Sequence, residues 1–197
     1  MLQINITMQK YYQHFSEIDN VYWTNYFLNE FIPKHEFFKK LSDTGSSYIE
    51  WYIKDFINEL QILKLSSLLS SRLKFPPIEY FLIFKHIVQP IHSDGREIIR
   101  NTSFNLPLLG YNGTSMCFYE QKTILPPITR DANYYDTDNL TLVEKFTGSN
   151  EWVLVNSAVP HNIVDMDPNN PRLTVCVRFL GNPTFEDLIK NAKSKQS

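Results

Sequence analysis

The chain has 197 residues, enough for one sizeable hydrophobic core, and we expect a single domain. Its formal net charge is −2 and its 19 Lys and Arg residues are dispersed, so we expect no nucleic-acid partner. No apolar run approaches the roughly 20 residues of a membrane-spanning helix, and no signal-peptide pattern is seen. With only two cysteines in the sequence, we expect a cytoplasmic protein without membrane association.

Residues 1–75 are predicted to be mostly helical and to support the rest of the chain. We expect a short helix or a helix pair over 24–41 and a longer helix over 46–74. Ser47 and Glu50 match a capping box at the start of the longer helix, and a Pro-Pro pair closes it. The apolar stripe that predicts this helix consists of Ile49, Ile53, Phe56, Leu60 and Leu63.

Residues 76–181 are predicted to form short strands separated by Gly, Pro, Asn and Asp. Strands at this spacing are typical of an antiparallel sandwich or a jelly roll. The segment 121–139 is a long insertion between two strands, and insertions of this length are usually functional lids or disordered excursions. Residues 182–197 are expected to form a short helix, capped by Thr184, and a tail. The expected strands cover 78–88, 102–109, 115–120, 140–146, 151–157, 161–166 and 172–180.

The stretch PIHSDGREIIRNTSFNLPL contains the first candidate site residues, His92 and Asp94. Residues two apart on an extended chain point their side chains to the same face. One imidazole and one carboxylate can therefore bind the same metal ion, with a third ligand from elsewhere in the chain. Two histidines and one carboxylate with open positions are typical of non-haem Fe(II) centres. The alternative is a polar turn in which Asp94 caps a backbone group.

Five histidines are present, which leaves few choices for the third ligand. His14 and His35 lie in the predicted helical region, and His86 lies inside a predicted strand, where packing on a sheet face is expected. His161 opens a late strand and is the best choice.

The last predicted strand separates two kinds of side chain. One face carries Leu and Val, typical of a core, whereas the other carries Arg172, Thr174 and Arg178. A buried guanidinium is costly unless it meets an anion, and its planar shape suits a carboxylate. This strand is therefore expected to hold a carboxylate beside the metal, with Thr174 as a further hydroxyl donor. Two alternatives remain. Arg178 could bind the anion in place of Arg172, and Arg172 could be a solvated residue at the edge of the sheet.

Together, His92-x-Asp94, His161 and Arg172-x-Thr174 resemble the iron(II)- and 2-oxoglutarate-dependent dioxygenases. The resemblance covers roughly residues 78–181 and implies a mainly β fold, a double-stranded β-helix (jelly-roll or cupin-like) core with supporting N-terminal helices. It does not separate the prolyl-hydroxylase-like branch from the aspartyl/asparaginyl-hydroxylase-like branch.

The resemblance implies an Fe(II) site formed by His92, Asp94 and His161. It implies that Arg172 and Thr174 bind the distal carboxylate of 2-oxoglutarate, and Asn105 is a further candidate for lining the cofactor pocket. The expected reaction uses dioxygen to hydroxylate a C–H bond of a small molecule or a peptidyl residue, with release of succinate and CO2. Two alternatives remain open: a non-catalytic cupin-like ligand-binding or sensor protein, and a metal-dependent isomerase or hydrolase.

Overall fold

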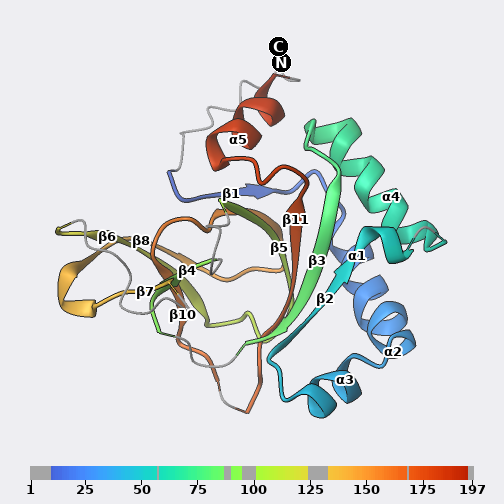
Figure 1. The fold of residues 1–197 in the computed structure, drawn as a ribbon, viewed down its shortest axis with the longest axis horizontal. Helices are drawn as coiled ribbons and strands as arrows, with labels where there is room; N and C mark the ends of the chain where they lie inside the picture. The colour runs from blue at the N-terminus through green and yellow to red at the C-terminus, as the bar shows by residue number, and fades with distance from the viewer. Residues whose placement is uncertain are drawn as a thin grey trace.

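Two antiparallel sheets face each other, and helices cover the outer face of the larger sheet, as Figure 1 shows. The expectation of a mainly β fold with helices is therefore confirmed. The arrangement comes from a computed structural model of the chain. The structure describes residues 10–56, 58–86, 90–94, 101–123, 133–167 and 169–194.

The larger sheet has six strands in the spatial order β1-β9-β5-β11-β3-β2. Its central strands are rich in β-branched and aromatic residues and are buried on both faces, so their sequences read as nearly continuous apolar runs. The strands are β1 (Tyr12–Phe15), β2 (Tyr48–Tyr52), β3 (Ile78–Lys85), β5 (Thr102–Leu109), β9 (Trp152–Asn156) and β11 (Leu173–Phe179).

The smaller sheet has five strands in the spatial order β7-β4-β10-β6-β8. From β3 to β6 the chain alternates between the two sheets, and from β8 to β11 it alternates again. The strands are β4 (His92–Ser93), β6 (Ser115–Gln121), β7 (Asn133–Tyr134), β8 (Leu140–Thr147) and β10 (His161–Val164).

Helical segments before β3, and one helix at the end of the chain, pack against the larger sheet. None of the described helices is long and apolar enough to cross a membrane. The C-terminal helix confirms its prediction, since Thr184 Oγ1 accepts a hydrogen bond from the Asp187 amide at 3.2 Å. The helical segments are α1 (Asn20–Tyr26), η1 (Phe27–Phe31), α2 (Ile32–Lys34), α3 (Phe37–Thr44), η2 (Ile53–Phe56), α4 (Leu60–Leu68), η3 (Leu69–Leu73), η4 (Thr137–Asn139) and α5 (Phe185–Lys193).

The predicted helix over 46–74 is wrong in its first part, because Tyr48–Tyr52 forms β2 and pairs with β3. Tyr, Ile and Trp favour a pleated surface, and pairing with a buried neighbouring strand outweighs the helical spacing. The proposed cap by Ser47 and Glu50 therefore does not form. The helical stripe is also shifted, since Leu60 and Leu63 are exposed. The buried face of α4 and η3 is formed by Ile62, Leu65, Leu69 and Leu73.

Three other expectations need adjustment. The described part of region 1–75 is mostly helical, but it also contains the two strands β1 and β2. The strand predicted over 161–166 ends at Val164, and Asp165 has a positive φ of 60°. The predicted strand 78–88 is described only to residue 86, and most of the insertion 121–139 lies outside the described residues.

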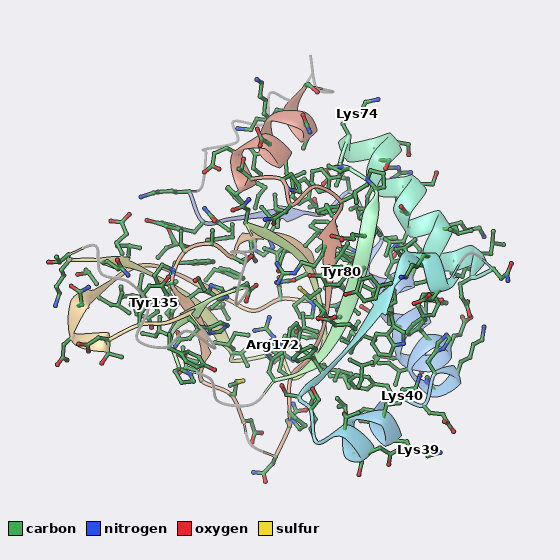
Figure 2. All side chains as sticks on the ribbon, in the orientation of Figure 1. Lys39, Lys40, Lys74, Tyr80, Tyr135 and Arg172 are labelled. Carbon is green, nitrogen blue, oxygen red and sulfur yellow. The ribbon has the colours of Figure 1, made fainter. Side chains whose placement is uncertain are left out.

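Alternating side chains on β11 belong to two different environments. Leu173, Val175, Val177 and Phe179 join the core beneath the helices, as the sequence pattern predicts. The other face, which carries Arg178 and is continued by Arg172 just before the strand, lies toward the smaller sheet. Figure 2 shows Arg172 in the space between the sheets, whereas Lys39, Lys40 and Lys74 lie at the helical periphery. A second cluster, which includes Tyr12, Phe118 and Val155, fills the space between the sheets near β1 and β9.

Candidate metal centre

The three predicted ligands meet at neighbouring strands of the smaller sheet. His92 on β4 pairs directly with His161 on β10, and their ring centroids are 4.7 Å apart. Asp94 follows β4, and its Oδ1 lies 3.6 Å from Nε2 of His92 and 3.8 Å from Nε2 of His161. One ligand atom from each residue falls within 4.8 Å of the other two. The structure thus brings together the side chains that the sequence singled out.

Both imidazoles are oriented by a backbone carbonyl two residues earlier in the chain. Nδ1 of His92 lies 2.9 Å from the Pro90 carbonyl oxygen, and Nδ1 of His161 lies 2.8 Å from that of Val159. A carbonyl oxygen only accepts, so in each ring Nδ1–H is the donor in these hydrogen bonds. In the neutral rings, Nε2 then carries the free lone pair, and Nε2 is the atom that faces Asp94. This tautomer is the one needed for metal binding through Nε2.

Arg178 holds the carboxylate from the opposite sheet. Its Nη2 donates to Asp94 Oδ2 at 2.5 Å, which leaves Oδ1 facing the two histidines. Its Nη1 donates to the Thr102 carbonyl at 2.6 Å and to Ser157 Oγ at 3.1 Å. The Asp94 amide also donates to the Ser157 carbonyl at 3.0 Å. These contacts fix the carboxylate and assign Arg178 to Asp94, which favours Arg172 as the anion partner.

The protonation states suit a cation site. Burial alone would raise the pKa of Asp94, but Arg178 and the two imidazoles outweigh it and hold the pKa at about 2. Burial lowers the pKa of His161 to about 4, despite the opposing effect of Asp94. At neutral pH the cluster therefore presents an ionised carboxylate and a neutral His161 imidazole to an incoming ion.

The donor set fits a divalent transition metal. Two imidazole nitrogens and one carboxylate oxygen suit Fe(II), Mn(II) or Zn(II), and three protein ligands leave positions open for other molecules. Because all three ligands come from β4, its end and β10, they occupy one side of the site. The cluster can hold a reactive metal while leaving room for ligands that are not part of the protein.

Arg172, the residue just before β11, lies on the same inner face as Arg178 but has no acidic partner among the described residues. Its side chain is buried, with Nε 3.2 Å from Thr174 Oγ1 and Nη1 3.5 Å from Thr114 Oγ1. Burial lowers its pKa from the usual arginine value to about 10. The reading of Arg172 as a solvated edge residue is therefore wrong. A buried guanidinium bonded only to hydroxyl groups is an incomplete site for an anion.

Asn105 also lies on the inner face, opposite Cys176 in the β5–β11 pairing. Its Oδ1 accepts a hydrogen bond from Ser103 Oγ at 2.5 Å. This position fits the prediction that it lines the space between the sheets. No described contact joins its side chain to Arg172 or to the ligand cluster.

The end of the 121–139 insertion lies beside the cluster. Strand β7 pairs with β4, and the Tyr134 ring lies 6.3 Å from that of His92. The hydroxyl of Tyr135 and Oγ of Ser93 are 3.0 Å apart. The part of the insertion that the structure describes is thus tied to the strand that carries His92. The idea that 121–139 acts as a lid stays a prediction.

Sequence reasoning missed several residues that shape the site. Thr114 contacts Arg172 from a distant part of the chain, and the carbonyls of Pro90 and Val159 orient the two histidines. No sequence pattern identifies these contacts. His86 was assigned to packing on a sheet face, although its backbone amide donates to the Arg172 carbonyl at 2.9 Å. That bond places His86 opposite Arg172, a position that depends on the register of β3 against β11 and not on a sequence pattern.

Comparisons with known proteins give no family assignment. No family model matches the chain, and no curated protein matches it. Among solved structures, matches include the X-ray structure of E. coli ycfD, with a TM-score of 0.31 and 14% sequence identity. That match covers 58% of this chain and 28% of the ycfD chain, so the chain spans well under a third of that structure.

Proposed function

We propose that this protein is an Fe(II)- and 2-oxoglutarate-dependent oxygenase that hydroxylates a C–H bond of a small molecule or a peptidyl residue. The observation that carries the proposal is a pair of sites between the two sheets. One is the cluster of two histidines and one carboxylate, and the other is the buried Arg172, which has no acidic partner in the part of the chain that the structure describes. A ligand that combines metal-binding oxygens with a distant carboxylate would satisfy both.

The path of the chain supports the same interpretation. The strands β3–β6 alternate between the two facing sheets, and so do β8–β11, while β6 and β8 pair with each other within the smaller sheet. This order supports a jelly-roll path, and on that basis we infer a double-stranded β-helix core. The metal cluster would then lie at the mouth of the core.

In the proposed reaction, dioxygen, 2-oxoglutarate and the substrate C–H bond give the alcohol, succinate and CO2. Iron(II), when bound, supplies the activation of dioxygen, with 2-oxoglutarate as the source of two electrons. His92, Asp94 and His161 hold the ion, and Arg178 keeps the Asp94 carboxylate ionised and oriented. Arg172 and Thr174 bind and orient the distal carboxylate of 2-oxoglutarate.

The test is an anaerobic titration of the metal-free protein with Fe(II) and 2-oxoglutarate. We expect a weak visible charge-transfer band that appears only when both are present. The variant His161→Ala should lose the band, because it removes one ligand. The matched variant His14→Ala should keep it, because His14 lies on β1 and contacts Glu151.

Substrate candidates can then be screened by succinate release. A folded wild-type protein that gives no band with both reagents contradicts the proposal. A ligand-binding protein without turnover, built on the same scaffold, would then be the better interpretation.

A further inference from the structure

His86 has a buried ring nitrogen without a hydrogen-bond partner. Its Nε2 meets no donor or acceptor in the part of the chain that the structure describes. A buried polar atom without a hydrogen-bond partner lowers the stability of the folded protein. Such an atom therefore usually gains a partner when the protein has its ligands bound. The metal cluster does not use it, since the described group of ligands consists of His92, Asp94 and His161.

The strand register places His86 next to Arg172. Strand β3 pairs with β11 so that Phe84 faces Thr174 and Lys85 faces Leu173. The bond from the His86 amide to the Arg172 carbonyl, at 2.9 Å, continues this ladder by one pair. Directly paired residues in antiparallel strands point to the same face, with β-carbons roughly 5 Å apart. His86 therefore reaches the inner face beside the guanidinium.

The ring of His86 is also held by its neighbour on the strand. It stacks on Phe84, with ring centroids 5.5 Å apart and an angle of 26° between the planes. Burial and the positive charge of Arg172 both keep the pKa of His86 well below its usual value. At neutral pH the imidazole is uncharged, so one nitrogen donates and the other accepts. The pair then offers one positive charge and an extra donor, which suits a carboxylate better than a dianionic phosphate.

We propose that His86 is a second binding residue for the carboxylate at Arg172, donating a hydrogen bond from Nε2 to one carboxylate oxygen. This inference rests on the proposed function, in which that carboxylate is the distal one of 2-oxoglutarate. His86 then helps to select 2-oxoglutarate over 2-oxo acids that end in an apolar group.

The test compares two ligands that differ only at the far end. 2-Oxopentanoate has the chain length of 2-oxoglutarate but carries a methyl group in place of the distal carboxylate. Dissociation constants for both are measured under anaerobic conditions with Fe(II), from the charge-transfer band. We expect His86→Phe to raise the dissociation constant for 2-oxoglutarate roughly tenfold, because the variant loses a hydrogen bond to a charged group. Binding of 2-oxopentanoate and of Fe(II) should stay unchanged.

Two further variants separate this role from general structure. His86→Gln keeps a donor and should lose less affinity for 2-oxoglutarate than His86→Phe. His35→Phe makes the same chemical change in the helical layer, where His35 packs on Phe31. It should leave the affinities for 2-oxoglutarate and 2-oxopentanoate unchanged. Equal affinity of wild type and His86→Phe for 2-oxoglutarate would overturn the inference, as would an equal loss for both ligands. A wild-type protein that binds Fe(II) but not 2-oxoglutarate would instead remove the proposed function, and the inference with it.

Discussion

Arg178 of β11 and Asp94 at the end of β4 form an ion pair that joins the two sheets, with Nη2 and Oδ2 2.5 Å apart. The carboxylate is thereby oriented before any metal arrives. We expect Arg178→Gln to weaken metal binding by roughly 10- to 100-fold, the usual cost of losing a residue that orients a ligand. Calorimetric titration of the metal-free protein with Mn(II) measures it. The exposed Arg72, which donates to the Glu17 carbonyl, provides the control variant Arg72→Gln. Metal affinity equal to wild type in Arg178→Gln would contradict this role.

Removing the other member of the pair should affect both stability and metal binding. Asp94→Ala leaves the Arg178 guanidinium buried without its anion, and breaking a buried pair in this way costs about 3 kcal/mol or more. We therefore expect a lower urea midpoint together with loss of metal binding. The double variant Asp94→Ala/Arg178→Met should recover part of the stability but none of the metal affinity. A double variant no more stable than Asp94→Ala would show that the unpaired charge is not the cause.

Arg172 should act on 2-oxoglutarate and not on the metal. Replacing it with Met keeps an unbranched, flexible side chain, although a shorter one, and removes the charge, so 2-oxoglutarate affinity should fall at least 100-fold under the proposed function. Fe(II) affinity should stay within about twofold, because none of the described contacts of Arg172 is to His92, Asp94 or His161. The two constants come from the same anaerobic titration. Unchanged 2-oxoglutarate binding would assign the carboxylate to another residue.

Gly110 offers a test of the backbone beneath the anion site. Its φ is +63°, and a β-carbon there would lie 2.8 Å from the backbone N and Cα of Arg172. Gly45 has nearly the same φ, +64°, but a β-carbon there would meet nothing within 4 Å. Gly45→Ala should therefore lower the free energy of unfolding by about 1 kcal/mol from strain alone, and Gly110→Ala should lower it by more. Under the proposed function, Gly110→Ala should also weaken the binding of 2-oxoglutarate. Chemical denaturation of the two variants gives the comparison, and equal losses would argue against the close approach.

Stability should depend on pH through His86. Its folded-state pKa lies well below 6.5, so between these values the unfolded chain binds a proton that the folded protein does not. The contribution of His86 is thus fully present above pH 6.5 and is lost as the pH falls. The slope is on the order of 1.4 kcal/mol for each pH unit within that window. Urea denaturation of metal-free wild type and His86→Phe at pH 7, 6 and 5 should show the difference between them shrinking or reversing. A constant difference would contradict a buried neutral imidazole.

Much of the fold could be predicted from the sequence because most strands carry local signals. The face that contains Leu173 and Val175 differs so clearly from the face that contains Arg172 that alternation alone assigns both. Strand β2 could not be predicted in the same way. Its residues fit helical spacing, and what decides the matter is pairing with β3, about 30 residues later.

The same distinction between local signals and long-range pairing applies to the candidate site. The ligands could be identified because His92 and Asp94 are close in sequence and few histidines compete for the third position. The role of Arg178 could not, since its partner lies 84 residues earlier and strand parity only shows which way the side chain points. His86 required the register of β3 against β11, which one sequence does not determine.

The two faces of β11 also determine where the chain tolerates changes in length. Inserting or deleting one residue inside β11 would exchange its faces beyond that point, because side chains alternate at every residue. The guanidinium of Arg178 would then turn toward the helices, and an aliphatic side chain would face Asp94. Folding and the ion pair that orients Asp94 would fail together after such a change. Relatives of this protein should therefore differ in length in the connecting segments and keep the number of residues in this strand.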